Sequence, residues 1–443
     1  MKIVVIGAAP TGLGAAYRLN ELQQSNTVGG DVELFVLEQE SYPGGLSCTV
    51  VDDKGFLWDM GGHITFNHNF PYYEHAVKWA VNEWNSLKRN CQVDVNYMFG
   101  EKGIHLVPYP AQYAIPLFPE DIKMNCLNDL RKRYKQVWTV EPERMNPAWV
   151  GTRVAKLPQA KLEELCGMST EELEKADFGW GPNAVFTFPK YGGTGAVWKA
   201  VTDKLPKKWF HFNCKVTKVN ANEKRLTYVE KSNDERRTKE ICYDVLVNSS
   251  PIDLLIKSTK LCPELNIEHN KVWIIGVGLK LPMTEFIKKI TWLYFPDSAV
   301  PFYRVTILSR YGEVTPDSSS YWSVMCECAR DIEDQTNEEE MRKMAIDGLI
   351  IKSIIKRDQI VSIYSTLLEY GYPIPTIKRD SELARAHKVL EEHSIYSRGR
   401  FGGWKYEASN QDHCFIQGKE LIDRLLLNEP EQLYKTGLPT KQG

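Results

Sequence analysis

A glycine-rich turn near the start of the chain has the residues to bind a diphosphate. Residues 7–14 read GAAPTGLG and follow an apolar run over residues 2–7. Where such a turn enters a helix, backbone N–H groups meet a pyrophosphate at the positive end of the helix. We therefore expect cofactor contacts from Gly7, Thr11, Gly12 and Gly14. Ala9 replaces the glycine that normally lets the backbone approach the phosphates.

An acidic residue and a second glycine turn follow. Glu38 ends the next apolar run, where its carboxylate would accept hydrogen bonds from a ribose hydroxyl; a solvated carboxylate at a strand end is the alternative. Residues 43–46 (PGGL) come close behind. Such a second turn supports the diphosphate side of FAD, and NAD dehydrogenases generally lack it. The combination predicts noncovalently bound FAD rather than NAD, with Gly45 and Leu46 among its contacts.

A third glycine cluster could reach the flavin ring. Gly61 and Gly62 permit a tight loop, and His63 after them could stand over the ring. A turn with an incidental histidine explains the same residues equally well.

Glycines recur in residues 398–406, just before a helix expected to begin near Asn410 and Gln411. The start of that helix, aimed at the flavin, would stabilise negative charge on the reduced ring. The alternative is a glycine loop followed by an N-capped helix.

The elements that must hold these residues begin with a βαβ unit. Residues 2–7 are predicted to form a buried parallel strand, residues 11–23 a helix and residues 32–37 a second strand. This order is typical of a doubly wound dinucleotide-binding fold.

The rest of the chain supplies other elements. Helices are expected at 71–88 and 119–130, each opening with proline, and the second suggests a helical insertion. From about residue 184 shorter strands indicate a mixed sheet, and further helices are expected at 338–355 and 410–427.

These elements predict an α/β protein with a Rossmann-like FAD-binding domain, a helical insertion domain and a mixed, largely antiparallel β-sheet domain. The expected boundaries are 1–70 for the first FAD-binding part, 71–152 for the helical domain, 153–250 for the return of the FAD domain with sheet segments, 251–370 for the substrate-side mixed sheet, 371–428 for the last FAD-domain part and 429–443 for a flexible tail.

Composition argues against several classes of partner. The chain has 443 residues, enough for two or three domains, and its formal net charge of -2 gives no reason to expect nucleic acid. No run approaches the about 18 apolar residues of a membrane-spanning helix, and the first residues lack a secretory signal. The ten cysteines have neither paired nor zinc-ligand spacing, so we expect reduced thiols, a cytoplasmic location and no metal.

With these segments together, the sequence closely resembles UDP-galactopyranose mutase of the eukaryotic type. The matching stretches are GGH at 61–63, VPYP at 107–110, WGPN at 180–183, GGTG at 192–195, WLYFP at 292–296, PFYR at 301–304, GYP at 371–373, SRGRFGGWKY at 397–406 and NQD at 410–412.

The resemblance implies a flavin-dependent isomerase that interconverts UDP-galactopyranose and UDP-galactofuranose without net redox change. In that family FAD is active when reduced, its N5 atom forms an adduct with the sugar, and NADPH supplies the reducing equivalents. UDP-galactose, in its pyranose and furanose forms, would be the ligand, and the chain could form a homo-oligomer.

The family's functional residues carry over to matching positions. Arg153 and Arg304 match two arginines that clamp the diphosphate, and His63 matches a histidine loop that responds to the flavin's redox state; these three are the expected catalytic residues. The other expected substrate contacts are Phe66, Tyr109, Gln112, Trp138, Asn183, Tyr294, Tyr372, Tyr406 and Asn410. Cofactor contacts beyond the first two turns are expected from Gly61, Gly62, His63, Val216, Arg400, Asn410 and Gln411. For a single arginine or aromatic residue, an exposed or core position is the alternative.

One segment departs from the family's pattern. Between Leu130 and Trp138 the family carries a further helical segment that is absent here, and Tyr134 falls where a pocket asparagine is expected. Three functions remain open. The first is an active mutase, and the second is a protein that binds FAD and UDP-sugar without turnover because part of the helical domain is missing. The third and less favoured is an FAD amine oxidase or desaturase, which would have no use for the two arginines.

Overall fold

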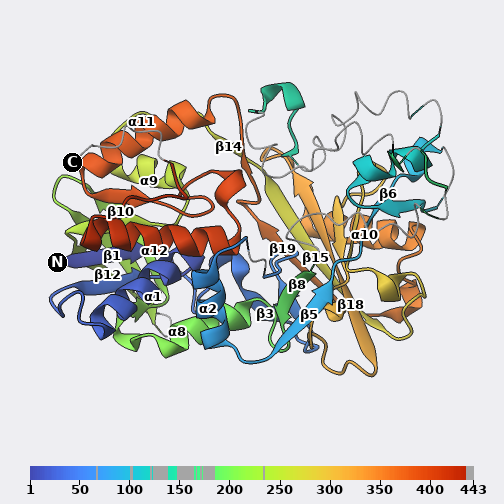
Figure 1. The fold of residues 1–443 in the computed structure, drawn as a ribbon, viewed down its shortest axis with the longest axis horizontal. Coiled ribbons are helices and arrows are strands. Elements are labelled where there is room, and N and C mark those ends of the chain that lie inside the picture. Colours follow the sequence, from blue (N-terminus) through green and yellow to red (C-terminus); the bar gives the residue numbers. More distant parts are fainter. Residues whose placement is uncertain are drawn as a thin grey trace.

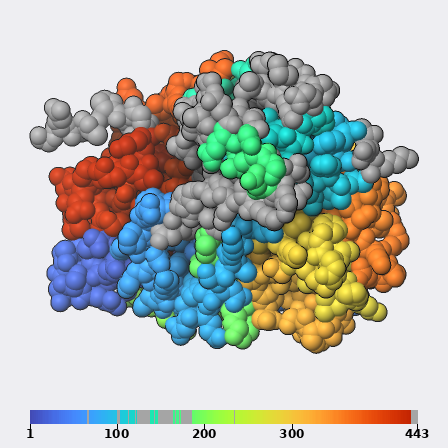
Figure 2. All heavy atoms as spheres, turned by 45° about the vertical axis from the view of Figure 1, so that its right-hand side comes forward, coloured from blue at the N-terminus to red at the C-terminus, as the bar shows by residue number. Residues whose placement is uncertain are grey.

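Two large sheets lie side by side in the computed structural model (Figure 1). The structure describes residues 1–65, 68–99, 103–119, 138–146, 185–232 and 235–435, with the short stretches 122, 164–165, 167–169 and 172. In the space-filling view the early (blue) and late (red) parts of the chain lie on one side, and the yellow and orange part around residue 300 lies on the other (Figure 2).

The first sheet is five-stranded, parallel and ordered β21-β13-β1-β2-β9. Its strands are β1 (Lys2–Ile6), β2 (Glu33–Leu37), β9 (Phe210–His211), β13 (Val245–Asn248) and β21 (Ile395–Ser397). An apolar run such as KIVVI suits a strand that is buried on both faces. Alternate side chains accordingly enter two cores, Ile3 and Val5 on one face and Val4 and Ile6 on the other.

Helices cover both faces of this sheet. The Ile3 face carries α1 (Pro10–Gln24), α2 (Pro71–Ala80), α8 (Gly195–Lys204) and α12 (Gln411–Leu427). The Val4 face carries α9 (Ile252–Thr259), α11 (Arg379–Glu392) and the antiparallel sheet of β10 (Cys214–Asn220), β11 (Arg225–Ser232) and β12 (Glu235–Cys242).

The second sheet has seven strands in the order β19-β15-β18-β17-β16-β6-β7, and every pair is antiparallel except β16 with β6. Its strands are β6 (Cys91–Asp94), β7 (Leu106–Pro108), β15 (Lys271–Lys280), β16 (Trp292–Tyr294), β17 (Arg304–Thr306), β18 (Tyr321–Arg330) and β19 (Ile360–Leu368). Helix α10 (Glu338–Ile351) packs on one face. On the other, Gly276 and Gly278 leave room for Trp58 and Phe56 of the hairpin formed by β3 (Thr49–Val51) and β4 (Leu57–Asp59).

Two short strand pairs and several 3₁₀ turns complete the described part. The pairs are β5 (Trp84–Lys88) with β8 (Val185–Pro189) and β14 (Glu268–His269) with β20 (Pro373–Ile374). The 3₁₀ turns are Gly45–Ser47, Asn96–Met98, Ala111–Leu117, Pro142–Arg144, Lys207–Trp209, Ile287–Lys289, Leu308–Arg310, Arg357–Gln359 and Tyr406–Ala408.

The expected α/β fold class is confirmed, while individual elements differ from expectation. The helix expected at 71–88 ends at Ala80, because Val81 is extended and the following residues pair with β8 as strand β5. The helix expected at 338–355 ends at Ile351, just before Ser353 with its φ of 55°. Most of the helix expected at 119–130 lies outside the described residues.

The segment that follows α12 also differs from expectation. We expected a flexible tail from residue 429, but Tyr434 is 3% exposed and packs against the body of the protein. Residues 436–443 of the expected tail lie outside the described residues.

Candidate functional site

A cavity of about 1330 Å³ is lined from both large sheets and brings most of the expected residues together. Those that line it are Gly7, Thr11, Glu38, Gly45, Leu46, Gly62, His63, Tyr109, Val216, Tyr294, Arg304, Tyr372, Arg400, Tyr406, Asn410 and Gln411. Gly61 lines a pocket of about 40 Å³ beside it. The parallel sheet supplies one end of the cavity, and β16 and β17 supply the other.

The first glycine turn is shaped by positions that leave no space for a side chain. Gly7 has a φ of 98°, and a Cβ atom there would lie 2.4 Å from the Ser249 hydroxyl oxygen. A Cβ on Gly12 would lie 2.1 Å from the carbonyl oxygen of Gly7. Gly7 and Thr11 line the cavity, whereas Gly12 and Gly14 are packing positions outside its lining.

Helix α1 begins at the cavity without a side-chain cap. Its N-cap residue, Ala9, makes no side-chain hydrogen bond, and Pro10 occupies the first helical position. N–H groups in the first turn of a helix lack intrahelical partners, so this end can bind an anion. A Cβ on Gly45 would lie 2.9 Å from the Ala9 methyl carbon. Because Gly45 has no side chain, the turn has room for the methyl group of Ala9, the residue that stands where the usual pattern has a glycine.

Glu38 is a buried carboxylate at the end of β2. It accepts hydrogen bonds from the backbone N–H groups of Ala8 at 2.8 Å and Glu40 at 3.0 Å. Burial raises the pKa of Glu38 although both hydrogen bonds lower it. The alternative of a solvated carboxylate is therefore wrong, since Glu38 is 6% exposed and holds the glycine turn against β2.

The same end has apolar walls. Val216 of β10 lines it together with Leu254 and Leu255 of α9. Such side chains suit the faces of a flat aromatic ring better than a charged group.

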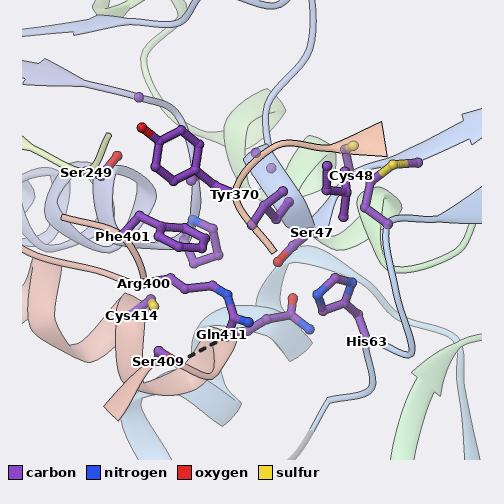
Figure 3. Close-up of a pocket in the computed structure, with 18 of the residues that line it drawn as sticks. Ser47, Cys48, His63, Ser249, Tyr370, Arg400, Phe401, Ser409, Gln411 and Cys414 are labelled. Atoms are coloured by element: carbon purple, nitrogen blue, oxygen red, sulfur yellow. Dashed lines mark hydrogen bonds between the residues drawn. The ribbon is translucent and has the colours of Figure 1, made fainter. Parts of the chain in front are cut away.

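Three polar side chains meet on another wall of the cavity. Figure 3 shows His63, Arg400 and Gln411 pointing toward one another from different segments. Arg400 donates to the Ser409 hydroxyl at 3.1 Å and to the Gly371 carbonyl at 3.0 Å. Gln411 is the first residue of α12, so the N-terminal end of that helix also reaches the cavity.

His63 is an uncharged imidazole at neutral pH. Burial lowers its pKa to about 4, with Glu327 raising it and Arg400 and Arg304 lowering it by smaller amounts. Its Nδ1 atom is buried and has no hydrogen-bond partner within the described ranges. Because buried polar atoms are normally paired, this nitrogen marks a place where a ligand could bind.

Arg304, on β17, is held by a carboxylate that the sequence did not reveal. Its Nε and Nη2 atoms donate to the two oxygens of Glu327, each at 2.6 Å. Glu327 also accepts from the Gly62 N–H at 3.0 Å and from the Tyr303 hydroxyl at 2.7 Å. Burial would raise the pKa of Glu327, but Arg304 and these hydrogen bonds lower it. The charged carboxylate therefore orients both the guanidinium group and the turn before His63.

Aromatic rings and a second arginine surround this guanidinium group. The rings of Tyr109 and Tyr294 stack with their centroids 5.1 Å apart, and Tyr372 lines the same end. Arg89, for which the sequence held no motif, lines the cavity with its guanidinium carbon 4.7 Å from the Tyr109 centroid. Two guanidinium groups make this end suitable for an anionic ligand.

Trp138 is buried beside the cavity but does not line it. Its ring packs edge-on against Tyr406 at 4.6 Å and against Tyr372 at 5.6 Å. Trp138 was expected to contact the substrate directly. In this structure it instead packs behind Tyr372 and Tyr406, two other residues expected to contact the substrate. Phe66, Arg153, Asn183 and Tyr134 lie outside the described residues, as does the side chain of Gln112.

One cluster near α12 has residue types that bind metals. The ligand atoms of His68, Asp412 and His413 lie within 4.8 Å of one another. However, the two imidazoles are stacked, with centroids 4.7 Å apart and planes at 29°. His68 instead pairs directly with Asp412 at 2.6 Å.

In the part of the chain that the structure describes, no helix combines the length and apolar character needed to cross a membrane.

Comparisons with known proteins agree with this fold. The family described as NAD(P)-binding Rossmann-like domain matches residues 5–80. Two solved structures share the fold at low identity. The CLA-producing fatty acid isomerase from P. acnes is 16% identical, with a TM-score of 0.56 over 95% of this chain and 98% of that one. A putrescine oxidase variant is 12% identical, with a TM-score of 0.56 over 96% and 99%.

A third similar structure has a much higher sequence identity to this chain than these two. The reduced UDP-galactopyranose mutase is 32% identical, with a TM-score of 0.85 over 98% of this chain and 95% of that chain. With that identity over nearly the full length of both chains, this chain belongs to the UDP-galactopyranose mutase family.

Proposed function

We propose that this protein interconverts UDP-galactopyranose and UDP-galactofuranose with the help of FAD. The observation that carries the proposal is the two-ended cavity. One end has a glycine turn, a helix start and buried Glu38, and the other has Arg304 among tyrosines. Family membership supports the assignment of these two ends to a flavin dinucleotide and a nucleotide-sugar.

The residues of the first end fit FAD. Gly7 and Gly45 lack the side chains that would fill the turn, the start of α1 suits a diphosphate, and Glu38 suits a ribose. His63 lines the same cavity, and its buried, unpartnered Nδ1 would be available to hydrogen-bond a bound flavin. When bound and reduced, FAD would supply the nucleophile that attacks the anomeric carbon of the sugar.

The protein groups of the other end would hold the leaving UDP. Arg304 keeps its charge and its orientation through Glu327, and Arg89 adds a second positive charge. Arg153 is proposed as a further clamp on the diphosphate. Tyr294, Tyr372 and Tyr406 offer hydroxyl groups to the same phosphates. The same contacts to the diphosphate with either form of the sugar would keep UDP in the cavity while the sugar ring opens and closes.

A neutral His63 suits this chemistry. With its pKa near 4, it can accept or donate a hydrogen bond without placing a proton charge beside the reduced ring. We further propose NADPH as the reductant, the eukaryotic type with a shortened helical segment before Trp138, a cytoplasmic location and a homo-oligomer.

The first test is turnover. Purified protein carrying FAD, reduced with dithionite and kept free of oxygen, should convert UDP-galactofuranose to UDP-galactopyranose in a chromatographic assay. Arg304→Ala should lower this conversion by at least about a hundredfold while the protein keeps its flavin, since a charged hydrogen bond to the diphosphate is lost. Near-full activity of Arg304→Ala would show that Arg304 is not a diphosphate clamp.

The alternatives give different results in the same assay. A protein that binds FAD and UDP without turnover would show UDP-induced changes in flavin absorbance but no conversion, in line with the departure before Trp138. An amine oxidase would have to accept a cationic substrate. Glu327 compensates the charge of Arg304, so Arg89 is the added positive charge that makes this end of the cavity unfavourable for a cationic substrate.

A further inference from the structure

The chain turns back after α12 and packs against the segment between β21 and α12. Helix α12 ends at Leu427, its C-cap residue Asn428 has a φ of 59°, and the following residues return along the body of the protein. Glu431 and Tyr434 are buried in this segment. We call residues 431–434 the clasp.

Glu431 joins the clasp to the turn that follows β21. Both of its carboxylate oxygens accept from Arg398, at 2.6 Å from Nε and 2.7 Å from Nη2. Arg424 of α12 donates to the same carboxylate at 2.8 Å. Burial would raise the pKa of Glu431, but the two arginines lower it, so the carboxylate is charged. Arg398 is fully buried, and its other carboxylate partner, Glu391, accepts from Nη2 at a longer 3.1 Å, so loss of Glu431 would leave this charge less well compensated.

Tyr434 reaches the other end of that turn. Its hydroxyl donates to the Gly403 carbonyl at 2.7 Å and lies 2.8 Å from Nε2 of His387. A Cβ on Gly403 would lie 2.7 Å from the tyrosine ring, so glycine is required for this contact. The guanidinium carbon of Arg398 lies 4.8 Å from the ring centroid. The clasp therefore touches both Arg398 and Gly403.

Arg400 lies between these two contacts. Its side chain points into the cavity toward His63 and Gln411 (Figure 3). The turn is also tight, because Gly403 N–H donates to the Gly399 carbonyl at 2.7 Å. A shift at either end of so short a segment would move the Arg400 guanidinium group.

We propose that the clasp positions the Arg400 turn and that tight retention of the flavin depends on it. Tyr434 and Glu431 are positioning residues, since neither lines the cavity. This inference rests on the proposed FAD function.

The test measures flavin release from the holoprotein. Tyr434→Phe keeps the ring but removes the hydroxyl, leaving the Gly403 carbonyl without this donor. We expect FAD to dissociate about tenfold faster from this variant, followed by flavin fluorescence after dilution. Glu431→Gln should act in the same direction, and a chain ending at Lys435 should release FAD at the wild-type rate.

Tyr17→Phe is the matched control. It removes a buried tyrosine hydroxyl of the same domain, 3.2 Å from His75, away from the cavity. We expect lower stability against urea but unchanged FAD release. Equal rates of FAD release from Tyr434→Phe and Tyr17→Phe would contradict the proposed role of the clasp in flavin retention. If the wild-type chain bound no FAD, the proposed function itself would fall.

Discussion

His63 is an uncharged side chain among charged ones, and this has a consequence for stability. Its pKa is about 4 in the folded chain, against an ordinary value of 6.5. Between these values the unfolded chain binds more protons than the folded one, so the free energy of unfolding rises with pH. We expect His63 to contribute at most about 3 kcal/mol, lost as the pH falls through this window. Urea unfolding of flavin-free protein at several pH values would measure it.

Asp59 makes the free energy of unfolding change with pH in the opposite direction, over nearly the same pH range. Burial raises its pKa to about 6 from 3.8, against hydrogen bonds from Thr49 and Thr194. Here the folded chain binds more protons, so the free energy of unfolding falls as the pH rises from about 4 to 6. Relative to the wild-type chain, the free energy of unfolding should therefore rise less steeply with pH in His63→Asn and more steeply in Asp59→Asn. Equal slopes in the two variants would contradict these assignments.

The sequence identified one half of the buried ion pair and missed the other. Arg304 stood in a recognisable motif, whereas Glu327 lay in an apolar strand without a motif of its own. The two residues are direct partners across β17 and β18. Such register depends on which strands become neighbours, and local sequence does not encode that choice.

At the scale of elements, α1 and α12 cross at a very short distance. A Cβ on Gly418 would lie 2.0 Å from the Thr11 carbonyl oxygen, and one on Gly14 would lie 2.0 Å from that of Phe415. Neither clash can be relieved by a side-chain rotation. The two helices therefore depend on paired glycines.

We expect Gly418→Ala to destabilise the protein by about 3 kcal/mol and to weaken FAD binding, because α1 must move away from α12 and Thr11 lines the cavity. Urea unfolding and flavin content would measure both effects. Gly30→Ala is the matched control, since a Cβ there meets nothing within 4 Å. An effect no larger than that of Gly30→Ala would show that the helices can separate freely.

The same scale shows which elements were predictable. The βαβ unit and the last helix, expected at 410–427 and found as Gln411–Leu427, carry strong local patterns. Strand β5 was taken for the end of a helix, because its residues become a strand only through pairing with β8, some hundred positions away. The crossing of α1 with α12 was equally invisible, although both helices were expected.

At the scale of the whole molecule, the site depends on how two sheets meet. Tyr109 follows β7 and Tyr294 ends β16, and β6 pairs with both strands. That order stacks two tyrosines from distant parts of the sequence. The resemblance to a family supplied these residues as a set, and composition or periodicity alone would have given only the dinucleotide-binding half.

If both sheets form the flavin site, binding of FAD should slow amide hydrogen exchange in both sheets. We expect FAD added to flavin-free protein to slow amide hydrogen exchange in β1 and α1 and also in β16 and β17, since residues from all four regions line the cavity or adjoin its lining. UDP added to the reduced holoprotein should add protection mainly at β16, β17 and residues near Tyr109. Helix α10, on the far face of the second sheet, serves as the internal control. Protection by FAD confined to β1 and α1 would mean that β16 and β17 are not a wall of the flavin site.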